Sequence, residues 1–135
     1  MKIKQVLARR IWDSRGRPTV EVEVVNDDGT RGLGIAPAGA SRGTREAVEL
    51  RDGGERFGGL DVQKAIAGIE REIAPALVAR DVADQAGIDA MLVALDGTPN
   101  KSRLGGNALI ATSLAVLHAA AARMRAGAWT CRTSW

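Results

Sequence analysis

The chain has 135 residues, of which 45% are hydrophobic and 26% are charged, and its formal net charge is +3 at pH 7. This length and composition fit one globular domain. The positive charge is small and forms no long block, so we do not expect nucleic-acid binding. No apolar run has the length of a membrane span and no signal peptide opens the chain, so we expect no membrane segment. The single cysteine, Cys131, cannot form an internal disulfide, and we expect a cytoplasmic protein.

The first third of the chain predicts a sheet of three antiparallel strands. Residues 2–12 fit a half-buried strand, and residues 19–25 alternate valine with glutamate, which is the strand period of two. Turn residues at 13–18 and the sequence Asn26-Asp27-Asp28-Gly29 indicate the two connections. In the third strand, residues 30–36, Gly32 and Gly34 share one face, which indicates that another element packs close to the backbone there.

The rest of the chain predicts about four helices. We expect a short helix over residues 44–51, a second helix capped by Asp61, a third capped by Asp84, and a last one from Asn107 to about Met124. The apolar residues at helical spacing are Val62, Ile66, Ile69 and Ile73 in the second helix, and Ile110, Leu114, Leu117, Ala121 and Met124 in the last. A meander of strands followed by helices indicates an α+β fold.

A loop rich in small residues joins the strands to the helices. Between residues 36 and 43 it contains Pro37, Gly39, Gly43 and a single hydroxyl, that of Ser41. Polar backbone with little side-chain bulk is typical of a loop that faces a ligand. It is equally typical of an ordinary strand-to-helix connection.

Several separated motifs, in this order and spacing, resemble the N-terminal domain of enolase, the glycolytic phosphopyruvate hydratase. They are residues 13–22, 37–41, 45–53, 95–102 and 106–108, and the resemblance covers residues 3 to about 123. It implies a capping domain, residues 1–124, of a Mg²⁺-dependent lyase that converts 2-phosphoglycerate into phosphoenolpyruvate. In that family a following barrel supplies the catalytic carboxylates and the lysine base. We therefore assign no catalytic residue here and expect the isolated chain to be inactive.

The resemblance also implies a role for the loop. It places Gly39, Ala40, Ser41, Arg42 and Gly43 against the substrate, and makes Ser41 a ligand of a second Mg²⁺ when a barrel is present. The loop departs from the family where Ala38 replaces a serine and Arg42 replaces a threonine. An inward Arg42 would disfavour Mg²⁺, or it could pair with the substrate phosphate. One serine cannot hold Mg²⁺ alone, so we do not expect tight binding by the isolated chain.

Arg9 and Arg15 occupy positions at which enolases place arginines that pair with barrel glutamates of the neighbouring subunit. The implied partners are an enolase-type barrel or a second subunit, possibly in a homo-oligomer. The alternative is a pair of exposed arginines on a basic edge with Arg10 and Arg17.

Other titratable side chains have simpler interpretations. Glu46 and Glu49 are three residues apart on the expected helix, where pairing with Arg42, Arg45 or solvent is favoured over acid–base catalysis. His118, the only histidine, lies in an alanine-rich helix and is interpreted as structural.

Residues 125–135 match nothing in the family pattern and contain two tryptophans and Cys131. We expect a divergent, disordered tail, and our hypothesis is a reading-frame shift near residue 124. A domain that evolved to cover a barrel should expose apolar surface without it. The alternative function is therefore a non-catalytic self-association or partner-binding module derived from a truncated enolase.

Overall fold

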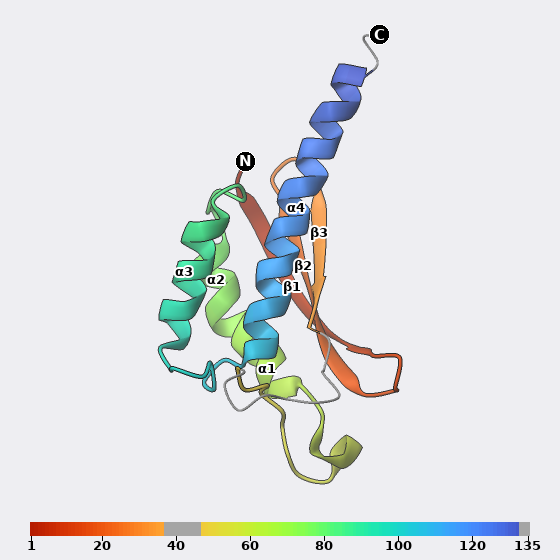
Figure 1. Ribbon diagram of the computed structural model, residues 1–135, viewed down its shortest axis with the longest axis vertical. Helices are drawn as coiled ribbons and strands as arrows, with labels where there is room; N and C mark the ends of the chain where they lie inside the picture. The colour runs from red at the N-terminus through yellow and green to blue at the C-terminus, as the bar shows by residue number, and fades with distance from the viewer. Residues whose placement is uncertain (37–46, 133–135) are drawn as a thin grey trace.

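The computed structural model describes residues 1–36 and 47–132, except for the side chains of residues 126–132. Its architecture is a three-stranded antiparallel sheet with helices packed against it (Figure 1). Strands β1 (Ile3–Trp12), β2 (Pro18–Asn26) and β3 (Arg31–Ile35) lie side by side in sequence order. The α+β fold and the meander predicted from the sequence are therefore confirmed.

Both hairpin turns form where the turn residues predicted them. The Asp13 carboxylate accepts hydrogen bonds from the backbone N–H groups of Arg15 and Arg17, each at 2.9 Å. In the second turn Gly29 takes φ 86° and its N–H donates to the carbonyl of Asn26. This positive φ explains why glycine stands at that position.

The helical part contains η1 (Arg56–Gly59), α1 (Gln63–Gly68), η2 (Ile69–Ile73), α2 (Ala74–Leu77), α3 (Gln85–Asp96) and α4 (Gly106–Arg132). The helices α1, η2 and α2 follow one another without a break, and η2 is a π-helix. Pro75 lies in the first turn of α2. Asp84 caps α3 as predicted, accepting from the N–H of Gly87.

The prediction of a helix over residues 44–51 is wrong for residues 47–51, the part of that range that the structure describes. Residues 47–51 have no regular secondary structure, and residues 44–46 lie outside the described ranges. The N–H of Val48 donates to the carbonyl of Asn100, and the N–H of Leu50 donates to the side chain of Asn107. Backbone groups that a helix would use internally are thus bonded to distant segments.

The core lies between the sheet and the helices. Val20, Val22 and Val24 are fully buried, which confirms the alternation predicted for β2. The close approach predicted at Gly32 and Gly34 is confirmed too, because α4 packs directly on β3. A Cβ added to Gly34 would lie 2.0 Å from the carbonyl oxygen of Ala111, and one added to Gly32 would lie 2.1 Å from the nitrogen of Ala119.

Several of the apolar residues that share helical spacing in α4 are exposed. Ile110, Leu117 and Met124 are 49%, 48% and 75% exposed. A backbone that lies directly on the glycines of β3 leaves room for small side chains only, so alanines face the sheet. The buried residues of α4 include Asn107, Ala108, Leu109, Ala111, Thr112, Ala115, Val116 and Ala119.

Helix α4 is longer than predicted. It continues to Arg132, beyond the expected end near Met124. Its stretch Gly106–Arg125 has a mean hydropathy of 1.2 and could cross a membrane by length and composition, contrary to the expectation that no apolar run is long enough. In this fold 44% of that window is buried, as in the core helix of a globular domain. The division into residues 1–124 and a divergent tail stays a prediction.

Candidate functional site

The predicted substrate loop, residues 39–43, lies outside the described residues, but the chain on both sides of it is described. On the N-terminal side, the N–H of Ala36 donates to the carbonyl of Val20 at 3.2 Å, and the carbonyl of Ala36 accepts from the Thr19 hydroxyl. On the C-terminal side, Val48 is bonded through its N–H to Asn100 at 2.8 Å and through its carbonyl to the N–H of Gly106 at 2.7 Å. We call these two flanks, Ile35–Ala36 and Ala47–Leu50, the loop stems.

Asn107 holds the C-terminal stem with its side chain. Its Oδ1 accepts from the N–H of Leu50 at 3.0 Å, and its Nδ2 donates to the carbonyl of Leu50 at 3.1 Å. Helix α4 begins at Gly106, one residue before the predicted start at Asn107, and the Asn107 amide reaches across to Leu50. The approach is close: a Cβ added to Gly105 would lie 2.5 Å from the Cβ of Leu50.

The turn between α3 and α4 is organised around Asp96, which is buried. Its Oδ1 accepts from the N–H of Thr98 at 2.9 Å, and its Oδ2 accepts from the N–H of Leu104 at 2.8 Å. Burial raises the pKa of Asp96, but the Thr98 hydroxyl and the two N–H groups outweigh it, so the pKa is lowered. This carboxylate therefore stays charged and shapes the turn whose Asn100 carbonyl holds Val48.

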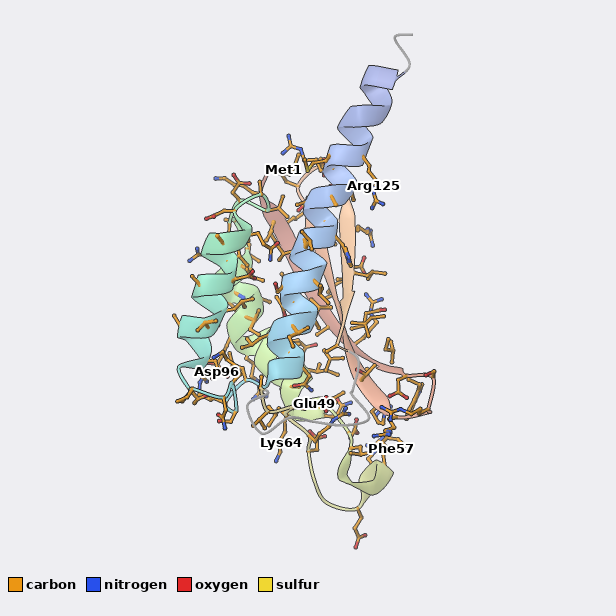
Figure 2. The ribbon with its side chains drawn as sticks, in the orientation of Figure 1. Met1, Glu49, Phe57, Lys64, Asp96 and Arg125 are labelled. Carbon is orange, nitrogen blue, oxygen red and sulfur yellow. The ribbon has the colours of Figure 1, made fainter. Side chains whose placement is uncertain are left out.

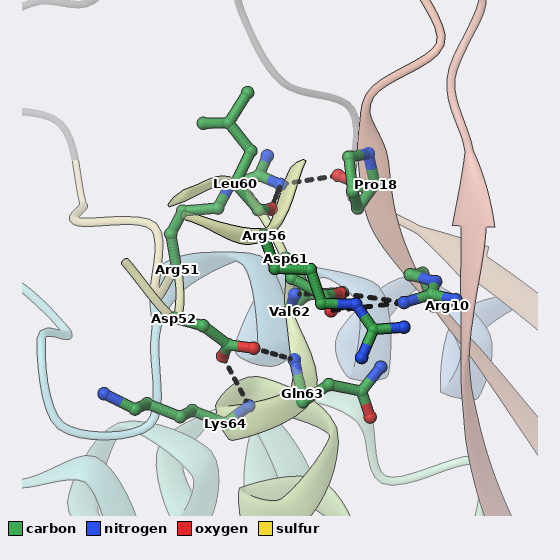
Figure 3. A network of polar contacts seen from close by, with 10 residues as sticks. All are labelled: Arg10, Pro18, Arg51, Asp52, Arg56, Leu60, Asp61, Val62, Gln63 and Lys64. Atoms are coloured by element: carbon green, nitrogen blue, oxygen red, sulfur yellow. Dashed lines mark hydrogen bonds and ion pairs between the residues drawn. The ribbon is translucent and has the colours of Figure 1, made fainter. Parts of the chain in front are cut away.

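A polar network joins the loop stem to the sheet and to α1 (Figure 3). The guanidinium of Arg51 donates to the carbonyls of Pro18 and Leu60 and forms an ion pair with Glu49 at 3.1 Å. Pro18 begins β2 and Leu60 follows η1, so Arg51 links three segments that are far apart in the sequence.

Asp52, next to Arg51, caps α1 from outside the helix. Its carboxylate accepts from the N–H of Lys64 at 2.8 Å and from the N–H of Gln63 at 3.1 Å. The cap predicted at Asp61 is wrong, because Val62 holds the N-cap position and the backbone N–H groups of Gln63 and Lys64 bond to Asp52 instead.

Asp61 instead forms a buried ion pair with β1. Both of its oxygens lie 3.2 Å from Nη1 of Arg10, its side chain is 2% exposed, and its Oδ1 accepts from the N–H of Val62 at 2.8 Å. Burial raises the pKa of Asp61, but the Val62 N–H and the Arg10 guanidinium outweigh it and the pKa is lowered. Arg10 therefore faces the helical side and does not share an exposed edge with Arg9.

Aromatic rings complete this contact. The guanidinium of Arg10 lies 5.2 Å from the ring centre of Trp12 and 5.1 Å from that of Phe57, and the two rings meet edge to face at 5.0 Å. The end of the β1–β2 hairpin is thus tied to η1 by one cation between two rings.

The predicted interface residues occupy different places. Arg9 lies on the sheet face opposite Arg10, where it pairs with Glu21 at 3.1 Å and with Glu23. Arg31 pairs with Glu23 from the other side at 2.7 Å, so three strands share one charge cluster. The hydrogen bonds from Arg9 and then Arg31 hold the pKa of Glu23 below its ordinary value. Arg15 lies in the hairpin turn, with its N–H on Asp13. Their role in an interface stays a prediction.

The remaining candidates have structural contacts or lie outside the described part. Glu49 pairs with Arg51. Its expected partners Arg42 and Arg45, together with Glu46 and the side chain of Cys131, lie outside the described residues. Nδ1 of His118 donates to the carbonyl of Leu33, which agrees with a structural role. The sequence did not indicate the Arg10–Asp61 pair, whose members are 51 residues apart. For the other contacts of the polar network, the sequence offered one signal: Arg51 and Asp52 are adjacent within the motif at residues 45–53.

Among the residues whose side chains are described, no three or more His, Cys, Asp or Glu side chains are grouped so that they could hold a metal ion. These residues do not by themselves fit a Mg²⁺ site, and Ser41 is not among them. What this end of the molecule does provide is a rigid frame for both stems of one loop.

A comparison with models of protein families matches residues 3–130 to the N-terminal domain of enolase. The match spans nearly the whole chain and extends beyond residue 123, where the recognised motifs end. It includes all the residues that hold the loop stems. The chain therefore belongs to the enolase N-terminal domain family.

Proposed function

We propose that this domain is the capping domain of a Mg²⁺-dependent lyase that converts 2-phosphoglycerate into phosphoenolpyruvate in the cytoplasm. The family match is the observation that carries the proposal. The geometry supports it, because a loop can cover a substrate repeatably only when both of its ends are held in place. Asn107, Asn100 and Thr19 hold those ends here.

In this proposal Gly39, Ala40, Ser41, Arg42 and Gly43 contact the substrate, and Ser41 contributes an oxygen to a second metal ion only beside a barrel. Enolases generally depend on Mg²⁺, and this family property supports Mg²⁺ as the cofactor. The described residues do not fit a metal site by themselves. In this proposal their role is to hold the loop stems and to form the surface by which the domain docks on a barrel.

An assay of 2-phosphoglycerate dehydration in Mg²⁺ tests this function. The purified 135-residue chain is expected to show no turnover alone and to gain turnover when an enolase barrel fragment is added. Asn107→Leu, which frees the stem at Leu50, should lower the restored rate, whereas Asn100→Ala keeps the backbone contact to Val48 and should not. Turnover by the chain alone would contradict the proposal.

A second candidate is a non-catalytic self-association module, favoured by the apolar side chains that α3 and α4 expose. Val93, Ile110, Leu117 and Met124 are each at least 48% exposed. Size-exclusion chromatography over a range of concentrations tests it. A dimer that becomes monomeric in Leu117→Gln would favour this candidate, and a monomer at all concentrations would remove it.

A further inference from the structure

A pocket of about 370 Å³ lies between the α1–η2 helix, the turn before α4 and Leu50 of the C-terminal stem. Its charged lining consists of Lys64, Arg71, Arg103 and Glu72. Three cations and one anion make the lining positive by two charges. Such an excess around a concave site favours an anionic ligand.

Two of the three cations have no partner among the described residues. Neither the ammonium of Lys64 nor the guanidinium of Arg71 forms a hydrogen bond or ion pair there, although both line the pocket. Figure 3 shows the Lys64 side chain pointing away from the Asp52 network, which bonds only its backbone N–H. Lys64 and Arg71 are seven residues apart, two helical turns, so they lie on one side of the helix.

Arg103 is held in place at the edge of the same pocket. Its Nη1 lies 2.9 Å from both carboxylate oxygens of Glu72, and its Nε donates to the carbonyl of Asp96 at 3.0 Å. Three hydrogen bonds therefore orient the guanidinium, while Glu72 is a partly exposed anion that a ligand could displace. The unpaired cations and this fixed cation converge from two separate segments.

The wall of the pocket has an unusual backbone. Arg71 and Glu72 belong to the π-helix η2, and the N–H of Ala74 reaches back to the carbonyl of Ile69. Single turns of π-helix occur frequently at functional sites. Gly68 forms the adjacent wall, where an added Cβ would lie 3.3 Å from Cδ2 of Leu104. The π turn and the glycine together shape the concave, partly apolar surface beneath the cations.

We propose that this pocket binds a small phosphate monoester. A phosphate monoester carries a charge of about −1.5 to −2 at pH 7, which matches the excess of the lining. Arginine forks and a lysine ammonium are the groups that bind phosphate oxygens well. The phosphate lies between Lys64 and Arg71, and its short carbon chain contacts Leu50 and Leu104. This proposal does not depend on the lyase function.

Amide chemical shifts measured during titration with glycerol 3-phosphate, at constant ionic strength, test the site. Saturable changes are expected at the amides of residues 64–72 and 103–104. Lys64→Gln and Arg71→Gln should each weaken binding by about tenfold, the usual effect of losing one charged hydrogen bond. The matched control is Lys4→Gln, which removes an exposed lysine of β1 outside the pocket and should change the affinity less than twofold.

A variant at Glu72 and a dicarboxylate ligand test the same site in two further ways. Glu72→Gln removes the competing anion and should tighten binding, while circular dichroism checks that each variant is folded. Malonate, a dicarboxylate of similar charge, should bind more weakly than the phosphate ester. Unchanged amide shifts, an equal loss of affinity in Lys4→Gln, or equal binding of malonate would overturn the proposal.

Discussion

Single buried polar side chains decide how the loop stems are held. Asp61, Asp96 and Asn107 are each less than 5% exposed, and each satisfies backbone or charged groups from a segment outside its own. A buried polar group is stabilising only when its partners are present, so removal of one partner costs more than an exposed contact. These residues are therefore the most sensitive points in the site.

Asp61→Asn is expected to lower the free energy of unfolding by about 1–3 kcal/mol, because Arg10 loses its carboxylate in a half-buried position. Urea denaturation measures the change. Asp27→Asn, which alters an exposed turn residue, is the matched control and should stay within about 0.5 kcal/mol of the parent. Equal effects from the two variants would show that the Arg10–Asp61 pair contributes nothing.

Asn107→Leu removes two hydrogen bonds to Leu50 and leaves both backbone groups of that residue without their partner. We expect a loss of about 2 kcal/mol and faster hydrogen exchange at the Leu50 amide. Asn100→Ala serves as the control, since Asn100 acts through its carbonyl. Unchanged exchange at Leu50 in Asn107→Leu would rule out this role of the side chain.

At the scale of elements, the contact between β3 and α4 determines the arrangement. Gly32 and Gly34 bring the strand within reach of the helix backbone, and alanines on α4 keep the distance short. The nitrogen Nδ1 of His118 adds a hydrogen bond to Leu33 of the same strand. Ile110 and Leu117 of α4, which do not lie on this contact, are exposed.

Gly34→Ala should destabilise the domain by about 3 kcal/mol or more, because the new methyl group would overlap the carbonyl of Ala111 and α4 would have to move. Chemical denaturation gives the value. Leu33→Ala, at a neighbouring residue that is 46% exposed, should cost less than about 1 kcal/mol. A tolerated Gly34→Ala would mean that the helix does not approach the strand this closely.

At the scale of the whole molecule, both loop stems and the polar network of Figure 3 gather at the end of the fold where α4 begins, and α4 extends away from it (Figure 1). Figure 2 places Glu49, Phe57, Lys64 and Asp96 toward this end, while Met1 and Arg125 lie at the other. The ion pairs of Arg51 and Asp61 therefore lie where the loop leaves the domain. Stability and site geometry depend on the same carboxylates.

Acid should unfold the domain through these carboxylates. The fold lowers the pKa of Asp61 and Asp96 from an ordinary value of 3.8, and that of Glu23 from 4.5. As pH falls, the unfolded chain takes up protons first, so stability is complete above these ordinary values and is lost as pH drops through the lower values of the folded state. Unfolding free energies measured between pH 7 and pH 3 should fall steeply below about pH 4.5.

The control for this dependence is Asp61→Asn combined with Asp96→Asn. The double variant should be less stable at pH 7 but should lose less stability between pH 5 and pH 3, because two of the linked groups no longer titrate. A slope identical to that of the parent protein would show that other groups cause the acid sensitivity.

Much of the fold follows from local patterns, and the exceptions share one cause. The alternation of Val20, Val22 and Val24 and the glycines of β3 predicted the strands and the close contact correctly. The helix at 44–51 was predicted wrongly from spacing in its described part, and the helical spacing in α4 did not indicate which face is buried. In each case long-range contacts decided the outcome.

The candidate site was less accessible to sequence reasoning. The motif at residues 95–102 and Asn107 were recognised, but their function as supports of a loop stem was not. Asp61 and Asp52 are both plausible caps by position, and only the path of the chain determines which of them meets the N–H groups of α1.

The sequence alone determined the family, the three-stranded meander and the turns at Asp13 and Gly29. These features depend on neighbouring residues and on the order of the motifs. The tertiary structure decided which side of α4 is buried, which carboxylate caps α1, and how the loop stems are anchored. The buried side of α4 depends on its packing against Gly32 and Gly34 of β3. The cap of α1 and the anchoring of the loop stems depend on hydrogen bonds and ion pairs between residues 11 to 57 positions apart, whose partners no local pattern specifies.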